Sequence, residues 1–518
     1  MSVDRGSVPV SKRRAPLTGQ ALRLAAGSPL ARLLPRRFME EYGVLPVGQE
    51  DGHVLVARGA AVEATVADEL CWAFRKPVRF VDAAAAEIQA AIMAAEERSG
   101  SGAEDEVEVV ADDAGALDDV RALASQAPVI RLVNVMILEA LRARASDLHL
   151  EATPDGLRVR HRIDGVLHDV SRPPRPYQAA VISRIKIMAK LNIAERRRPQ
   201  DGRIRLRLSE RDVDVRVSTL PSVHGESVVL RILDRGDRIP DLTALGMSDA
   251  LLASFRRALR QPTGIVLVTG PTGSGKTTTL YAVLQDVHAP DMKLITVEDP
   301  VEYQIEGVTQ VPADERAGAG FATLLRSLLR HDPDILMVGE MRDAETARVA
   351  IQSALTGHLV FSTLHTNDAP SGITRLFDMG IEPYLVAATV QAVLAQRLVR
   401  VVCDTCGEPV EPSPADLAGL ALPAAWTTAA DPARFRRGRG CDACSGTGYQ
   451  GRTGLFELMV VDDRLRSLIA SGAPLDSLRS AAGQAGMKPL RWDGFVKART
   501  GVTTLDEVLR VTRDNDAP

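Results

Sequence analysis

The chain has little of several features that mark common protein classes. Aromatic residues make up 4% of its 518 residues, and only five residues are cysteine. It contains no run of about 18 apolar residues, so we expect no membrane-spanning helix. Its net charge of -4 lacks the basic excess typical of duplex-binding proteins. The basic residues 12–14 are not followed by an apolar stretch, which argues against a secretory signal and favours the cytoplasm.

A glycine-rich segment has the spacing of a phosphate-binding loop. Residues 270–277 fit the pattern G-x-x-x-x-G-K-[ST]. The apolar residues 264–268 predict a buried strand before it, and residues 278–287 predict a helix after it. In such a turn the glycines let successive backbone N–H groups surround phosphate oxygens, so we expect a nucleoside triphosphate here. The candidate binding residues are Gly270, Pro271, Thr272, Gly273, Ser274, Gly275, Lys276, Thr277 and Thr278.

Two side chains of this loop have distinct expected roles. Lys276 would neutralise charge on the β- and γ-phosphates, and the Thr277 hydroxyl would ligate magnesium. The alternative is a glycine-rich turn that matches the pattern by accident. The strand and helix expected on either side of the loop argue against that alternative.

Three further apolar runs each end close to a residue that phosphate chemistry could use. Ligands bind outside the carboxyl ends of the strands in a parallel α/β sheet, so these residues should converge on the phosphate loop. The runs and the residues after them are 293–297 with Glu298 and Asp299, 335–338 with Glu340, and 359–363 with His365.

These residues suggest a division of catalytic roles. Glu340 could orient or deprotonate the attacking water. Taken alone, each carboxylate is more often a solvated residue at the end of a strand, because charged residues normally face water. Their recurrence beside a phosphate loop favours the catalytic interpretation. The candidates for holding magnesium through water are Glu298, Asp299 and Glu302, and those for hydrogen bonding to the γ-phosphate are His358 and His365.

Segments around these residues resemble the motifs of the secretion ATPases of type II secretion and type IV pilus assembly, the general secretion pathway protein E type. The Walker A, Asp box, Walker B and His box correspond to GPTGSGKTT, ITVEDPVEY, DPDILMVGEMRD and TGHLVFSTLHTNDA. Two upstream segments, APVIRLVNVMILEALRARASDLHLE and RRRPQDGRIRLRL, resemble the family's second amino-terminal domain. The likeness spans about residues 125–515. As in the family, Gly339 and not an aspartate precedes Glu340. Thr277 and the Asp box must therefore supply more of the magnesium ligands.

The resemblance implies a multidomain α/β fold: a RecA-like P-loop ATPase core, a preceding PAS-like α/β domain, a small amino-terminal α/β domain and a four-cysteine zinc insert. It also implies a homohexameric ring that hydrolyses ATP to drive pseudopilus assembly and protein export by type II secretion. Type IV pilus extension is the close alternative. The amino-terminal domain would dock on inner-membrane platform proteins, which would place the protein peripherally on that membrane.

The length of the chain requires several domains. Between residues 104 and 119 there are eight acidic residues and no lysine or arginine, which predicts a flexible linker. Binding of a basic partner surface by this stretch is the alternative. We expect a mobile amino terminus (1–26), a docking domain (27–98), the acidic linker (99–122), an arginine-bearing domain (123–236), the ATPase core (237–400), a zinc insert (401–452) and a helical carboxyl-terminal part (453–518).

Arginine is dense between residues 196 and 207, where six occur within twelve residues. The simplest interpretation is a solvated basic face. A nucleic-acid surface lacks the interleaved aromatics that bases stack on, so we expect no nucleic-acid partner. The resemblance gives a sharper role, because Arg203 and Arg216 match arginines that reach the ATP phosphates in the family. Closure of their domain onto the nucleotide would then make hydrolysis depend on conformation.

Four of the five cysteines form two pairs, Cys403-x-x-Cys406 and Cys441-x-x-Cys444. Four thiolates at such spacing suit tetrahedral zinc. Disulfides are the weaker alternative, because the cytosol keeps thiols reduced. The family carries the same four-cysteine insert. A nucleic-acid motor or a zinc-bearing binding module would also use a phosphate loop and such cysteines, but the acidic charge and few aromatics disfavour both.

Overall fold

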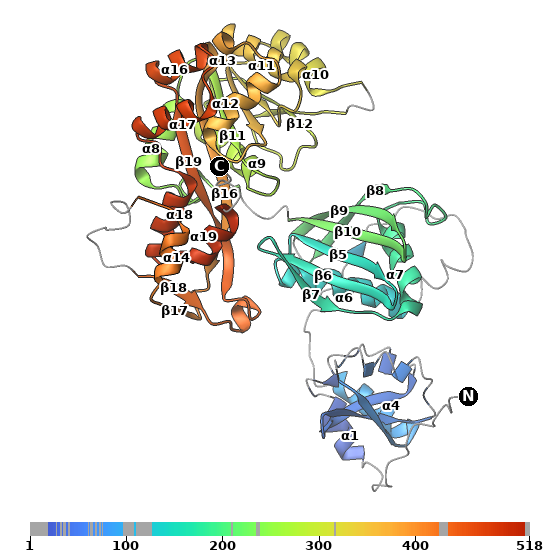
Figure 1. Ribbon diagram of the computed structural model, residues 1–518. Coiled ribbons are helices and arrows are strands. Elements are labelled where there is room, and N and C mark those ends of the chain that lie inside the picture. The colour runs from blue at the N-terminus through green and yellow to red at the C-terminus, as the bar shows by residue number, and fades with distance from the viewer. Residues whose placement is uncertain are drawn as a thin grey trace, which may run out of the picture. The chain divides into compact units, whose positions relative to one another are not determined.

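The chain forms two compact units, Met1–Asp105 and Glu106–Pro518. They are seen in a computed structural model (Figure 1). Among the residues that it describes, no helix is long and apolar enough to cross a membrane. The described residues are 19–96 (except 27, 29, 32–33, 35–37, 40–41, 61, 63–65, 68–69, 72–73 and 75), 108–109, 127–208, 211–234, 239–314, 318–423 and 434–512.

The first unit is a small α/β domain. Its elements are α1 (Gly19–Ala26), β1 (Val44–Glu50), β2 (His53–Arg58), β3 (Val78–Asp82) and α4 (Ala85–Glu96). β1 pairs antiparallel with β2, and β2 pairs parallel with β3. Leu22 of α1 is fully buried with Val54 and Ile88 in one apolar core. The prediction of a mobile terminus is therefore wrong for residues 19–26, because the apolar side of α1 packs into this core.

The predicted acidic linker lies outside the described residues except for two positions. These form the short strand β4 (Glu108–Val109). β4 pairs antiparallel with β8 (Gln200–Leu208), where Val109 lies opposite Leu206 and Glu108 opposite Arg207. Part of the segment predicted to be a linker therefore belongs to the sheet of the next domain, which begins before residue 123.

The arginine-bearing domain is a seven-stranded antiparallel sheet with the order β4-β8-β9-β10-β5-β6-β7. Its other elements are α6 (Ala127–Arg142), β5 (Asp147–Thr153), β6 (Gly156–Ile163), β7 (Val166–Ser171), α7 (Arg175–Met188), β9 (Arg211–Ser222) and β10 (Gly225–Asp234). Val213, Val215 and Val217 of β9 are buried, whereas Asp214 and Arg216 between them are half-buried. This period of two confirms the predicted half-buried strands and leaves one face of the sheet polar.

The ATPase core is a seven-stranded sheet with the order β13-β12-β14-β15-β11-β16-β19. Its elements are α8 (Asp249–Leu259), β11 (Gly264–Thr269), α9 (Lys276–Val287), β12 (Leu294–Glu298), β13 (Thr309–Pro312), α10 (Phe321–Leu328), η3 (Leu329–His331), β14 (Ile335–Val338), α11 (Ala344–Leu355), β15 (Leu359–Leu364), α12 (Ala369–Asp378), α13 (Pro383–Thr389), β16 (Val390–Val402) and β19 (Tyr449–Val460). The strands from β13 to β16 run parallel, and β19 pairs antiparallel with β16.

Strand β11, which lies inside this sheet between β15 and β16, is buried on both faces. Ile265 and Leu267 pack into one apolar core, whereas Val266 and Val268 pack into another. Helices therefore cover both faces (Figure 1), which explains why this strand is a continuous apolar run and not an alternating one. The parallel strands bring the ends of β11, β12, β14 and β15 to one edge, as expected from the sequence.

The cysteine pairs lie between β16 and β19, two long strands that pair from Ala392 opposite Val460 to Val402 opposite Tyr449. The intervening elements are β17 (Gly407–Pro409), α14 (Pro414–Gly419), β18 (Arg436–Gly438) and η4 (Asp442–Cys444). The part after β19 contains α16 (Asp463–Ala470), α17 (Leu475–Gln484), α18 (Leu490–Arg499) and α19 (Leu505–Thr512). The prediction of a helical part from residue 453 is thus wrong for residues 453–460, because β19 completes the core sheet.

Candidate nucleotide site and cysteine cluster

The predicted phosphate loop connects β11 to α9, so the expected strand and helix are both confirmed. Gly275 caps the helix with a φ of 87°, in the left-handed region that side chains other than glycine disfavour. A Cβ there would lie 2.8 Å from Nε2 of Gln396. The glycine thus satisfies both the backbone turn and the close approach of β16.

Lys276 is held by its own loop. Its Nζ donates to the carbonyl oxygens of Gly270 at 2.8 Å and Pro271 at 3.0 Å. Burial lowers the pKa of Lys276 to about 8, although the charge of Glu340 opposes this shift. A phosphate bound to the loop would supply the negative charge that favours the ammonium form. The geometry is that of a preformed anion site.

A cavity of about 750 Å³ opens beside the loop. Most of the predicted site residues line it. Gly270, Pro271 and Ser274 belong to the loop but do not line the cavity. The Ser274 hydroxyl is buried and has no hydrogen-bond partner among the described residues. The predicted residues that line it are Thr272, Gly273, Gly275, Lys276, Thr277, Thr278, Glu298, Asp299, Glu302, Glu340 and His365.

Glu340 follows β14 and lies at the expected edge of the sheet. Its Oε2 lies 2.7 Å from Nε of Arg342 and 3.5 Å from Nε2 of His365. The Glu340 side chain is 17% exposed and reaches the cavity. Arg342 was missed by the sequence reasoning, although its position two residues after Glu340 was a signal. Its guanidinium pairs with the Glu340 carboxylate at the edge of the cavity.

Glu298 differs from the other candidates because both of its oxygens already have partners. Its Oε1 accepts from Oγ1 of Thr296 at 2.6 Å and from Nε2 of Gln310 at 3.0 Å. Its Oε2 accepts from the hydroxyl of Tyr281, whose pKa is raised by burial and by this carboxylate. Glu298 is 3% exposed, so it anchors α9 to β12. The other candidates for magnesium are Asp299 and Glu302, of which Glu302 is paired with Arg216.

His358 does not lie at the site, and its predicted contact with the γ-phosphate is wrong. It precedes β15, whose first residue Leu359 pairs with Gly264 at the amino end of β11. The phosphate loop follows the opposite end, a six-residue strand or roughly 20 Å away. The Nδ1 of His358 lies 2.8 Å from the carbonyl oxygen of Ser353. His358 therefore caps the end of α11.

The arginine-bearing domain contacts the core through Arg216 and Glu302. Two parallel contacts join the side chains, Nη1 to Oε1 at 3.2 Å and Nη2 to Oε2 at 3.0 Å. Arg203 and Arg216 line a second cavity of about 590 Å³ together with Asp299. Arg231 lines both cavities. It was missed by the sequence reasoning, although it occupies an outward position of an alternating strand, as Arg216 does.

The four predicted zinc ligands converge. The Sγ atoms are 3.9 Å apart for Cys403 and Cys441, 3.8 Å for Cys406 and Cys444, and 3.7 Å for Cys441 and Cys444. All four lie within 4.8 Å of one another, and none forms a disulfide. A tetrahedral zinc with bonds of about 2.3 Å requires Sγ separations of about 3.8 Å. The cluster therefore fits zinc.

Backbone donors also prepare this cluster for thiolates. The N–H groups of Cys441 and Gly448 both lie 3.2 Å from Sγ of Cys444. Burial would raise the pKa of the Cys444 thiol, but these donors and the neighbouring cysteines outweigh it and lower the pKa to about 6. A thiolate is the form that binds metal.

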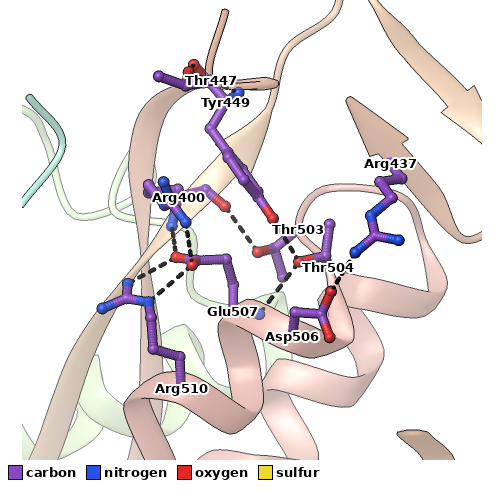
Figure 2. Close-up of polar contacts among 9 residues, drawn as sticks. All are labelled: Arg400, Arg437, Thr447, Tyr449, Thr503, Thr504, Asp506, Glu507 and Arg510. Atoms are coloured by element: carbon purple, nitrogen blue, oxygen red, sulfur yellow. Dashed lines mark hydrogen bonds and ion pairs between the residues drawn. The ribbon is translucent and has the colours of Figure 1, made fainter. Parts of the chain in front are cut away.

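A polar network joins α19 to β16 and β19, the two strands between which the cysteines lie (Figure 2). Glu507 is buried, and it accepts from Nη2 of Arg400 at 2.6 Å and from Nε and Nη2 of Arg510 at 2.8 and 2.7 Å. The ring of Tyr449 lies under the Arg400 guanidinium, 4.0 Å from its Cζ, and its hydroxyl lies 3.0 Å from Oγ1 of Thr504. Three residues beyond Arg400 lies Cys403, so this network supports the base of the cysteine cluster.

A parallel sheet with a phosphate loop after β11 and a carboxylate after β14, two strands away in the sheet, defines a P-loop ATPase. The chain belongs to the family of Type II/IV secretion system proteins, whose model matches residues 122–510. Residues 21–102 match the model of the MshEN domain. The protein is therefore a secretion ATPase with an amino-terminal domain of a recognised type, which confirms the family expected from the sequence motifs.

Known proteins of this kind match most of the chain. It is 48% identical to type II secretion system protein E of Xanthomonas campestris pv. campestris, over 93% of this chain and 85% of that protein. It is 41% identical to the type IV pilus assembly ATPase PilB of Myxococcus xanthus, over 93% of this chain and 86% of that protein. A crystal structure of the pilus retraction motor PilT with bound ADP matches at a TM-score of 0.51 and 25% identity, covering 73% of this chain and 96% of PilT.

Proposed function

We propose that this protein is the cytoplasmic ATPase motor of a type II secretion system, where ATP hydrolysis drives pseudopilus assembly and protein export. The observation that carries the chemistry is the shared cavity of Lys276 and Glu340, at the carboxyl ends of β11 and β14 in the same parallel sheet. The higher identity to type II secretion system protein E than to PilB favours export. Pilus extension is the second candidate, because the match to PilB also covers 93% of the chain.

The residues divide the proposed reaction as follows. The loop N–H groups and Lys276 bind the β- and γ-phosphates of ATP. Glu340 orients the attacking water and accepts its proton, while His365, 3.5 Å from Glu340, would hydrogen-bond to the transferred group. Thr277 would hold magnesium, with Asp299 and Glu302 acting through water. When bound, magnesium would neutralise charge on the phosphates.

The arginine-bearing domain would make hydrolysis depend on conformation. Arg216 is paired with Glu302 on the core, so a phosphate that takes over this guanidinium must displace the carboxylate. Arg203 lines the same cavity as Arg216. The family resemblance implies that the chain assembles as a homohexameric ring. Domain closure in each subunit would then be converted into motion.

The remaining parts have proposed supporting roles. The four cysteines would bind structural zinc, for which their Sγ separations are suitable. The amino-terminal domain would dock on inner-membrane platform proteins, which would make the protein peripheral on that membrane. Its match to the MshEN model covers residues 21–102 and supports a separate binding domain.

The test is Glu340→Gln, which keeps the size of the side chain but removes the base. ATP affinity, measured with a fluorescent analogue, should stay within about threefold, whereas kcat should fall by about 10²-fold or more. Glu345→Gln is the matched control, because Glu345 is 63% exposed and pairs with Arg326. Near-parental turnover in Glu340→Gln would refute the assigned base.

The biological arm replaces the chromosomal gene of the source organism with the Glu340→Gln variant. Loss of extracellular enzymes with pili retained supports the type II motor. Loss of surface pili with secretion retained supports pilus extension, and no change in either refutes both.

A further inference from the structure

The strand register places three arginines in one row across the sheet of the arginine-bearing domain. Arg203 of β8 lies opposite Arg216 of β9, and Arg216 lies opposite Arg231 of β10. β8, β9, β10 and β5 lie side by side in Figure 1. Neighbouring strands are about 4.8 Å apart, so the three guanidiniums project from adjacent positions on one face. We call residues 203, 216 and 231 the arginine row.

Like charges directly opposite one another destabilise a sheet unless anions compensate them. Arg216 is compensated by Glu302 of the core. Arg203 has no ion pair or hydrogen bond among the residues that the structure describes. The row therefore carries more positive charge than its protein partners neutralise, which is the electrostatic condition for a polyphosphate ligand.

Asp147 of β5 ends the row. It lies opposite Arg231 in the register, and Arg162 of β6 lies opposite it on the other side. Its Oδ1 accepts from Nε of Arg231 at 2.9 Å, and its Oδ2 accepts from Oγ of Ser146 at 2.7 Å. The Asp147 side chain is 7% exposed. A carboxylate this buried is stable only with cationic and hydrogen-bonding partners, so its position is well defined.

The two carboxylates hold their arginines by different atoms. Glu302 engages both Nη atoms of Arg216, so a phosphate must break that pair to bind the guanidinium. Asp147 engages only Nε of Arg231, and the side chain of Arg231 is 61% exposed toward both cavities. Its Nη groups have no hydrogen-bond partner among the residues that the structure describes. The pair with Asp147 can therefore persist while Arg231 binds an oxyanion.

We propose that Asp147 is a positioning residue for ATP hydrolysis, which holds Arg231 by Nε and aims its Nη groups at the nucleotide phosphates. The inference rests on the proposed role of the arginine row. It adds a residue that touches no substrate and acts only through another side chain. The sequence gives no indication of it, since 84 positions separate the two residues.

The test is a double-mutant cycle on the full-length protein with Asp147→Ala, Arg231→Ala and the combined variant. Arg231→Ala should lower kcat by roughly 10-fold, and Asp147→Ala by about 3- to 10-fold. In the Arg231→Ala background, Asp147→Ala should lower kcat no further, because its target is gone. A similar loss in both backgrounds would overturn the proposal and show that Asp147 has only a structural role.

Two further variants keep the test decisive. Asp147→Asn preserves size and one acceptor, so it should reduce kcat less than Asp147→Ala and remains available if the alanine variant does not fold. Asp169→Ala removes a second aspartate, 2.8 Å from Arg158 on the same sheet, and should leave kcat unchanged. If Arg231→Ala has the parental kcat, the proposal that the arginine row binds the nucleotide phosphates is wrong. If Glu340→Gln also retains parental kcat, the proposed active site is wrong.

Discussion

The phosphate loop and the arginine row are both proposed to present cations to one nucleotide, but they are held in opposite ways. Lys276 is 9% exposed and bonded to carbonyl oxygens of its own loop, so its position depends on a few adjacent residues. Arg216 is bonded across to another domain, so its position depends on how two domains meet. In the proposed mechanism the loop can therefore bind nucleotide in every state, whereas the row contributes only when the domains are closed.

The largest expected effect comes from breaking the loop. Lys276→Ala removes the buried ammonium and should weaken ATP binding strongly, with kcat/KM reduced by about 10²-fold or more. Nucleotide affinity and ATPase rate are the measurements. Lys293→Ala, at an exposed position before β12, is the control and should behave like the parent. Parental affinity in Lys276→Ala would contradict the assigned site.

Arg216→Ala should have a smaller and different effect. Arg216 lies in the domain that is proposed to close onto the nucleotide. Its loss should therefore lower kcat by roughly 10-fold while ATP affinity changes by less than about threefold. Arg216→Lys should rescue poorly, since lysine lacks the planar fork that binds two oxygens. Arg205→Ala is the matched control, because Arg205 projects from β8 and its side chain is 83% exposed.

Two other outcomes would each change the interpretation of Arg216. A loss of affinity as large as that of Lys276→Ala would mean that the two domains are already closed before ATP binds. Parental kcat in Arg216→Ala would mean that the arginines are only a solvated basic face, the alternative that the sequence left open.

The same contrast explains how much the sequence could predict. The loop, its strand and its helix can be predicted from consecutive residues. Glu340 can be predicted because it comes shortly after the apolar run 335–338. The arginine row depends on pairing between strands, and single-residue register decides which side chains lie together. Arg231 and Asp147 were therefore missed. His358 was misassigned although the predicted strand at 359–363 places it at the amino end of that strand, away from the phosphate loop.

Domain boundaries failed for a similar reason. β4 joins the arginine-bearing sheet through two residues within an acidic stretch, and composition cannot reveal such a pairing. β19 was taken into a helical part although it pairs with β16 over most of its length. The four cysteines, by contrast, were predictable because metal ligation requires a particular residue type at a particular spacing.

The smallest effect is expected from a substitution at Glu507, which supports the cysteine cluster by buried ion pairs. Unlike Lys276 and Arg216, this residue is a buried anion held by two arginines. Burial would raise the pKa of Glu507, but hydrogen bonds from Arg510 and Arg400 outweigh it and lower the pKa to about 2. The folded-state pKa is thus below the ordinary value of 4.5. Ionised Glu507 stabilises the fold above about pH 4.5, and this contribution is lost as the pH falls toward 2.

Glu507→Gln should therefore lower the Tm at pH 7, on the order of 5 °C, because two arginines lose a buried charged partner. The difference from the parent should shrink as the pH falls below about 4.5, which Tm measurements from pH 7 to 3 would show. Zinc content should stay at about one per chain, since no thiolate contacts Glu507. Glu408→Gln, at an exposed pair with Arg439 in the same region, should change little. A Tm difference that is independent of pH would show that Glu507 stabilises α19 by packing and not by charge.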